Sequence, residues 1–166
     1  MAINAFISFF DKANGESIQR GKENWVEIQG WDWEVEAATA FSHGGGASAG
    51  RVTPGNFNFQ HSFDSSSTVI LAYLCSGRRF PKIELQVTKI AGDGNAETYF
   101  TMTMEEITIT KVSNIGTSEG SIIQQVQLSF QKVNIEYKAQ DNRTGAMLPP
   151  MNFNWDIPSG TVSPSS

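Results

Sequence analysis

The amino-acid sequence predicts an all-β domain with one flanking α-helix, folded as a small β-barrel or orthogonal sandwich. Most of the chain consists of short stretches in which apolar and polar side chains alternate, as in half-buried strands, and only residues 64–77 have the end signals of a helix. Three strand-like stretches move their apolar residues from even to odd positions midway, which indicates strands that turn a corner between two sheets. The 166 residues suffice for one such domain.

The first half of the chain holds three predicted strands. Residues 2–10 alternate and form the first strand, which ends at the turn 12–17. The second spans residues 25–36, and its apolar positions change parity at Gly30, where a bulge or bend is favoured. The third spans residues 57–63, where phenylalanines alternate with polar residues. This pattern predicts a sheet with one hydrated face.

The second half holds the remaining predicted strands. Residues 83–88 alternate simply, whereas residues 100–109 change parity across 105–106 and residues 126–137 change parity across 131–132. A second explanation of these changes is that half of each strand faces a partner subunit. Residues 152–156 form the last strand, so a single domain is expected over residues 1–158, followed by a flexible C-terminal tail at 159–166.

Residues 64–77 predict the single helix. Asp64 is a typical N-cap residue, and Gly77 suits a left-handed C-cap. Between them the helix is apolar on nearly all sides, as in helices that are buried on more than one side, and Cys75 in this run is expected to be buried. The candidate packing or interface residues of the helix are Val69, Ile70, Leu71, Tyr73 and Leu74.

A long connection rich in glycine and alanine separates the second and third strands. It far exceeds the usual length of about 4–6 residues, so it is expected to be functional or disordered. Its small side chains offer little packing of their own, so its order is expected to depend on contact with another surface. The candidate contact residues of this loop are Thr39, Phe41, His43, Gly44, Gly45, Gly46, Ala47, Ser48 and Gly50.

Charge and targeting signals limit the partners. With 17 acidic and 12 basic side chains the net charge is −5 and the isoelectric point about 5.0, which disfavours a nucleic acid or an anionic membrane as partner. No apolar run approaches the roughly 20 residues of a membrane span. The N-terminus lacks the basic and apolar regions of a cleaved signal peptide, so any export is expected to be unconventional.

Catalytic patterns in the sequence lack the context that they need. Residues 116–120 match the G-x-S-x-G pattern around Ser118, but this pattern requires a following helix and a later histidine, and both His43 and His61 come earlier. Residues 45–50 have the glycine spacing of a phosphate loop but no lysine after it. Two histidines without a carboxylate or cysteine at ligand spacing make no metal site. We therefore expect a protein that is not an enzyme and has no cofactor.

Two non-enzymatic classes fit these residues. Four tryptophans in a β-sandwich are compatible with a carbohydrate-binding module, because aromatic faces stack on sugars. The glycine loop, the apolar helix and the bent strands are instead compatible with self-assembly. Trp31 and Trp33 share a strand face with Val35, which favours a core or an interface over an open sugar platform.

The order of features along the chain resembles the haemolysin-coregulated protein (Hcp) family, the tail-tube subunits of bacterial type VI secretion systems. The resemblance spans nearly the whole chain and depends on the ordered set of features, while residues 18–24 depart from the family's pattern. The matching features are Gly15, Glu16 and Ser17, then Trp31, Asp32 and Trp33, the glycines of 44–50, Gly77, Phe80, Pro81, Lys89, Gly92, Trp155, Asp156 and Ile157.

The resemblance implies a phage-tail-tube-like fold that assembles as a homohexameric ring, and rings that stack into a hollow tube. The partners that it implies are further copies of the chain, the contracting sheath, the baseplate and spike, and the effector proteins that the tube carries. It also implies a cytoplasmic protein that is exported by type VI secretion without a cleaved signal peptide. The loop 39–50 would then be an inter-subunit or inter-ring contact.

Overall fold

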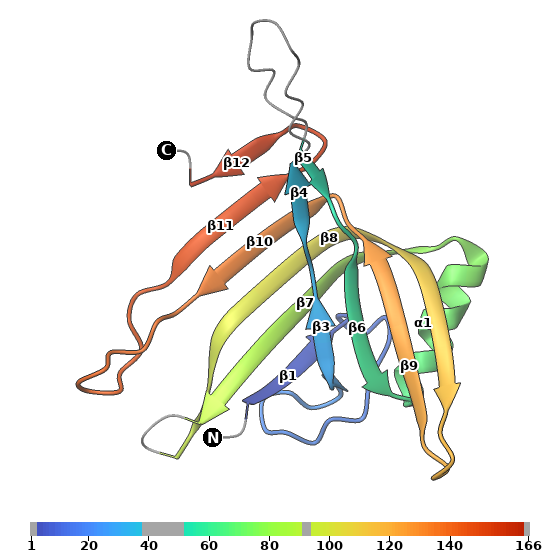
Figure 1. The fold of residues 1–166 in the computed structure, drawn as a ribbon. Helices are drawn as coiled ribbons and strands as arrows, with labels where there is room; N and C mark the ends of the chain where they lie inside the picture. Colours follow the sequence, from blue (N-terminus) through green and yellow to red (C-terminus); the bar gives the residue numbers. More distant parts are fainter. Residues whose placement is uncertain (1–2, 38–51, 91–93, 165–166) are drawn as a thin grey trace, which may run out of the picture.

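A computed structural model of the chain describes residues 3–37, 52–90 and 94–164 (Figure 1). Within these residues the chain forms twelve strands and one helix. The strands are β1 (Ile3–Ser8), β2 (Val26–Ile28), β3 (Gly30–Asp32), β4 (Val35–Ala37), β5 (Val52–Pro54), β6 (Phe57–Ser62), β7 (Arg79–Ile90), β8 (Ala96–Gly116), β9 (Ile122–Ser129), β10 (Lys132–Tyr137), β11 (Met151–Asp156) and β12 (Thr161–Ser163), and the helix is α1 (Ser65–Ser76).

Ten of these strands form one strongly curled sheet. Its main order is β12, β11, β10, β8, β7, β1 and β2, and a branch runs from β8 through β9 and β6 to β3. The chain passes from β2 to β3 with only Gln29 between them, so the two ends of the curl meet at this bend (Figure 1). The predicted all-β fold with one flanking helix is confirmed. The sheet curls around the core without closing into a barrel, because its end strands β2 and β3 are joined by the chain and not by a ladder of hydrogen bonds. β10, β11 and β12 extend away from the curl as an open wing (Figure 1).

β8 is the strand around which the curl is built. Residues 100–105 of β8 pair with β10, and residues 108–116 pair with β9. The change of partner falls at Glu106, which has a left-handed φ of 56°. Met104 and Ile107 are both fully buried on either side of it, so the unusual backbone re-aims the buried face. The parity change in the sequence therefore marks a corner, as predicted.

The other parity changes also mark bends. The second predicted strand, residues 25–36, is divided into β2, β3 and the start of β4, and the first division falls at Gln29, next to the expected Gly30. Residues 126–137, expected as one strand, form β9 and β10 with Phe130 and Gln131 between them. At the C-terminus, Thr161–Ser163 pairs with β11 as β12, although these residues were expected in a flexible tail.

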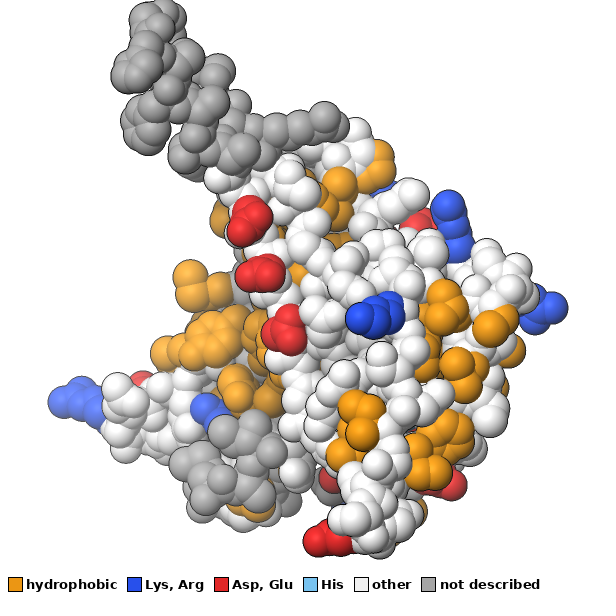
Figure 2. Space-filling model, turned by 45° about the vertical axis from the view of Figure 1, so that its right-hand side comes forward, with side chains coloured by type: hydrophobic (Ala, Val, Ile, Leu, Met, Phe, Trp, Pro, Cys, Tyr) orange, Lys and Arg blue, Asp and Glu red, His pale blue; other side chains and the backbone are white. Residues whose placement is uncertain are grey.

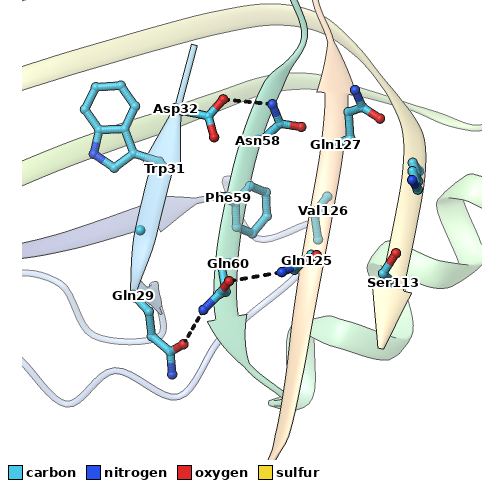
Figure 3. Close-up of a pocket in the computed structure, with 12 residues that line it drawn as sticks. Gln29, Trp31, Asp32, Asn58, Phe59, Gln60, Ser113, Gln125, Val126 and Gln127 are labelled. Carbon is cyan, nitrogen blue, oxygen red and sulfur yellow. Dashed lines mark hydrogen bonds between the residues drawn. The ribbon is translucent and has the colours of Figure 1, made fainter. Parts of the chain in front are cut away.

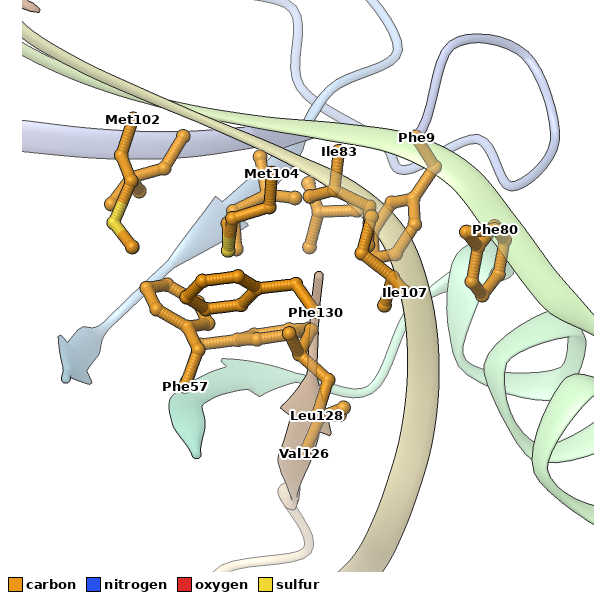
Figure 4. Packing of buried hydrophobic residues seen from close by; sticks show 14 of the residues in the cluster. Phe9, Phe57, Phe80, Ile83, Met102, Met104, Ile107, Val126, Leu128 and Phe130 are labelled. Carbon is orange, nitrogen blue, oxygen red and sulfur yellow. The ribbon is translucent and has the colours of Figure 1, made fainter. Parts of the chain in front are cut away.

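The core lies inside the curl. Phenylalanines from several strands meet methionines and aliphatic side chains of β7 and β8 (Figure 4). The rings of Phe9 and Phe80 lie 4.9 Å apart at 56°, a tilted arrangement that is favourable for aromatic pairs. The largest fully buried side chains are Phe6, Phe9, Phe57, Phe80, Ile7, Ile70, Ile83, Leu85, Met102, Met104, Ile107 and Leu128.

α1 begins and ends where the sequence predicts. The backbone N–H of Ser66 donates to Asp64 Oδ1 at 2.9 Å, and the backbone N–H of Asp64 donates to Ser67 Oγ at 3.0 Å, which together form a capping box. Gly77 ends the helix with a left-handed φ of 70°. Cys75 is exposed, so the expectation that it is buried is wrong.

Candidate assembly interface

α1 covers one side of the curled sheet and buries a narrow face there. Ile70 is fully buried in the core. Three flanking residues pack partly against the same core, namely Val69, Tyr73 and Leu74. The ring of Tyr73 stacks on Phe80 with 3.9 Å between centroids and 8° between planes. Most of the candidate helix residues therefore already have partners within the chain.

The outward side of α1 consists of small or polar side chains. Its exposed residues are Ser65, Thr68, Ala72, Cys75 and Ser76. The second apolar face expected from the sequence is not formed by these residues, because the curved sheet already contacts both flanks of the helix. Leu71, which is half-buried, is the candidate with the least evident role in the core. An interface role of α1 stays a prediction.

The nine candidate residues of the glycine loop lie outside the described residues, which end at Ala37 and resume at Val52. The described segments on both sides of the loop form the ribbon of β4 and β5, in which Val35 pairs with Pro54. The loop is therefore connected to the rest of the domain through this two-stranded ribbon.

A row of side-chain amides crosses the outer face of β6 and its neighbours (Figure 3). The amide nitrogen of Gln125 donates to Gln60 at 3.2 Å, that of Gln60 donates to Gln29 at 3.0 Å, and that of Gln29 donates to Ser62 at 2.9 Å. Because each amide is both donor and acceptor, the row is continuous over three chain segments. We call this surface the amide face.

The amide face lines a shallow hollow of about 550 Å³. Asn58 donates to Asp32 at 2.9 Å at one end of it. Asp32 and Lys111 are the charged residues among those that line the hollow. The alternation of Asn58 and Gln60 with buried phenylalanines predicts one hydrated face, but the sequence does not show that Gln29 and Gln125 join it, because the pairing of remote strands brings them together.

The tryptophans make contacts that disfavour a sugar-binding platform. Trp31 stacks against Phe57 and Phe100, at 5.9 and 5.4 Å between ring centroids. Trp33 lies against Phe130, and its indole N–H donates to the carbonyl oxygen of Gly55 at 3.2 Å. Trp25, under the Lys22 ammonium, and Trp155, against the core, are half-buried, whereas Trp31 is 36% exposed.

His61 belongs to a buried polar network beneath the start of α1. Its Nε2 lies 2.8 Å from Gln124 Oε1, and the amide nitrogen of Gln124 donates to Asn114 at 3.0 Å. His61 Nε2 therefore donates to Gln124. Its Nδ1 lies 3.7 Å from Asp64 Oδ2. The histidine is fully buried and joins β6, β9, β8 and the cap of α1, which is a structural role.

Burial alone would raise the pKa of the Asp64 carboxyl, but interactions with the His61 side chain and with Ser66 outweigh it and lower this pKa. A lowered pKa means that the ionised carboxylate stabilises the folded state. This contribution is complete above the ordinary carboxyl pKa of about 4 and is lost as the pH falls through the lowered value.

We expect Asp64→Ala to lower the free energy of unfolding by about 1–2 kcal/mol at neutral pH, because the N-cap acceptor is lost. Asp64→Asn is the matched control, since it keeps a capping oxygen and removes only the charge. Urea unfolding at neutral pH and at pH values below about 4 measures both. An Asp64→Ala variant with the same free energy of unfolding as wild type at neutral pH would contradict this prediction. So would a variant whose free energy of unfolding falls between neutral and acid pH by as much as that of wild type.

An apolar groove lies between two parts of the structure that are distant in sequence. The ribbon of β4 and β5 forms one wall, and β11 with β12 forms the other, around a volume of about 800 Å³. Three valines that line it are about half-exposed, Val35 at 44%, Val52 at 48% and Val162 at 46%. Its other lining residues are Trp33, Thr53, Pro54, Phe153, Trp155, Ile157 and Gly160. Exposed apolar surface of this kind marks a contact site.

Other exposed apolar residues are dispersed over the molecule. Figure 2 shows hydrophobic side chains in several separate areas of one face. The exposed apolar residues outside the groove include Phe63, just before α1, and Ile115 and Ile122, near the end of β8 and at the start of β9.

No group of three or more His, Cys, Asp or Glu side chains in the described parts of the chain is arranged to hold a metal ion. Across residues 3–37, 52–90 and 94–164, no helix is both long and apolar enough to cross a membrane.

Comparison with known proteins gives one consistent result. The family model described as "Type VI secretion system effector, Hcp" matches residues 6–137. The chain is 27% identical over 158 residues to Protein hcp1 of Pseudomonas aeruginosa, which covers 95% of this chain and 96% of the relative. It is 25% identical over 133 residues to the Major exported protein of the same species, over 76% of each chain.

Solved structures share the fold. One described as "Structure of a type six secretion system protein" superposes with a TM-score of 0.87 at 20% identity, over 98% of this chain and 100% of that chain. The curled sheet, the single helix and the wing are therefore features of an established fold.

Proposed function

This chain belongs to the Hcp family of type VI secretion proteins, and from that membership we propose that it is a structural subunit of the secretion tail tube. In this proposal six copies form a ring, and rings stack into a hollow tube that carries effector proteins. A closed ring needs two different surfaces on each copy, because each subunit contacts its neighbours in a heterologous way. The curled sheet supplies unlike surfaces on its several sides, among them the free edge of β12.

The amide face is the observation that carries the proposal beyond family membership. A channel that passes folded or partly folded proteins needs a hydrated wall that does not bind them too tightly. Side-chain amides satisfy one another on this face, and Asp32 and Lys111 are the charges at the hollow. We assign this face to the lumen of the ring, where effectors would meet a polar and nearly uncharged surface.

The partners and the localisation follow from the same proposal. The subunit would bind copies of itself, the sheath around the tube, the baseplate and spike at its end, and the effectors inside it. It would reside in the cytoplasm until firing and leave through the secretion system, in keeping with a relative named as a major exported protein. The family is one of structural secretion components, and we propose no catalytic role for this chain.

We expect the purified protein to give hexamers in native mass spectrometry and rings with an open centre in negative-stain images. A monomer as the sole species throughout the micromolar range would contradict the proposal. A variant lacking residues 44–49 tests the glycine loop. It should keep the β-sheet circular-dichroism spectrum of wild type and lose ring stacking, and loss of that spectrum would contradict an interface role of the loop.

A further inference from the structure

The segment between β1 and β2 carries the most exposed apolar side chain among the large hydrophobic residues of the described chain. Ile18 is 95% exposed, although isoleucine is among the residues most often found buried. It lies within residues 18–24, the part of the chain that departs from the family pattern, and its neighbours there are mainly polar. Burial against the described residues therefore does not account for an isoleucine at this position.

The backbone on both sides of Ile18 is fixed. The backbone N–H of Asn24 donates to Ser17 O at 2.9 Å, and that of Gly15 donates to Asn24 O at 2.8 Å, so the base of the segment is closed like a hairpin. Ser17 Oγ also accepts the backbone N–H of Gln19 at 3.2 Å. Ile18 is thus presented in one place, and a partner would not have to order the segment.

A turn directly after Ile18 completes this rigid segment, and we call its residues 18–24 the tip. The backbone N–H of Lys22 donates to Gln19 O at 2.8 Å, and Gly21 has the positive φ of 81° that such a turn requires. The Lys22 ammonium lies 4.9 Å from the centroid of the Trp25 ring, which holds the far side of the tip. Arg20 is exposed at the turn, close to Ile18 in sequence.

The apolar groove has the chemistry to receive this tip. Its half-exposed valines offer aliphatic surface to an aliphatic side chain, and its volume of about 800 Å³ exceeds what one isoleucine fills. Glu34 and Glu36, which flank Val35, do not line the groove, because side chains alternate between the two faces of a strand. The match between tip and groove is therefore one of aliphatic surface.

The tip and the groove lie at opposite ends of the subunit. In Figure 1 the chain between β1 and β2 reaches the lower part of the view, whereas β4, β5 and β12 lie at the top. When identical copies join through patches at opposite ends, the contact repeats in one direction and does not close into a ring. This arrangement suits contacts between stacked rings better than contacts within one ring.

We propose that Ile18 of one subunit inserts into the apolar groove of a second copy in the next ring. This inference rests on the proposed tube function and names a contact that stacks the rings. One isoleucine buries little surface, so a single contact is weak. Six contacts between two rings act together, because after the first has formed the others are intramolecular. Stacking would then be cooperative while single subunits in solution stay apart.

Two charge variants and one conservative variant test the contact. Ile18→Asp and Val162→Asp should each reduce the equilibrium constant for ring stacking more than tenfold and leave the hexamer intact, because a carboxylate would be buried among valines and tryptophans. Ile18→Leu should stack like wild type. Ring formation is measured by native mass spectrometry and stack length by negative-stain images. Normal stacking of Ile18→Asp would overturn the inference.

Disulfide trapping tests the same contact without disrupting it. In a Cys75→Ser background, Ile18→Cys and Val162→Cys together should give covalently linked subunits on oxidation, and neither cysteine alone should do so. Absence of linkage in stacked rings would refute the contact. The two levels of the proposal fail differently, because a wild-type protein without rings rejects the tube function, whereas rings that stack independently of Ile18 reject only this contact.

Discussion

Replacing Ile70 by alanine should lower the free energy of unfolding of the subunit by about 2–5 kcal/mol. Ile70 is fully buried and is the apolar residue through which α1 enters the core. The substitution removes several methyl and methylene groups and leaves a cavity between α1 and the sheet, which the rigid strands can fill only in part. Urea unfolding at a concentration where the protein is monomeric measures the effect.

Leu74→Ala is the matched control, one helical turn further along α1. Leu74 is half-buried at the flank of the core, so the same kind of deletion should have a clearly smaller effect on unfolding. If α1 also contacts a neighbouring subunit, Leu74→Ala should weaken hexamers more than it weakens the fold. If the two variants lost the same unfolding free energy, the prediction that the fully buried Ile70 contributes more to stability than the half-buried Leu74 would be wrong.

Replacing Gly15 by alanine should destabilise the protein by about 1–3 kcal/mol, through overpacking rather than through a cavity. A methyl group on Gly15 would lie 2.5 Å from the carbonyl oxygen of Trp25 and 2.7 Å from the Cα atom of Val26. Both are backbone atoms at the start of β2 and cannot move aside as a flexible side chain can. The expected result is a lower melting temperature and a distorted segment 16–24.

Gly116→Ala separates this steric effect from the general effect of replacing a glycine. Gly116 ends β8, and an added methyl group would meet no heavy atom within 4 Å. The melting temperature of the Gly116→Ala variant should therefore equal or slightly exceed that of wild type, because alanine restricts the unfolded chain. If the Gly15→Ala and Gly116→Ala variants had the same melting temperature, the close approach at Gly15 would be refuted.

Features that depend on neighbouring residues could be predicted from the sequence. The caps at Asp64 and Gly77 are local hydrogen-bonding and φ requirements, and α1 begins and ends there. The parity changes are also local, since two-residue alternation shows directly where a strand alters its buried face. The parity changes predicted the corner at Glu106 and the bend beside Gly30.

Features that depend on the pairing of distant segments could not be predicted. The apolar groove joins β4 and β5 to β11 and β12, about a hundred residues later, and one of its valines, Val162, lies in residues that were expected to form a flexible tail. The amide face likewise needs the register that places Gln60 opposite Gln125. Cys75 was wrongly expected to be buried because apolar character was counted around the whole helix, whereas the sheet covers Ile70 and its flanks and leaves the side with Cys75 exposed.

The continuity of β8 has a mechanical consequence. This strand runs from Ala96 to Gly116 without a break and is hydrogen-bonded in turn to the wing and to β9. Because β8 turns a corner at Glu106, one covalent strand belongs to both parts of the curl, and the wing can be displaced relative to β9 only by breaking ladder hydrogen bonds (Figure 1). The wing and the part of the sheet that holds β9 should therefore move together as one stiff body.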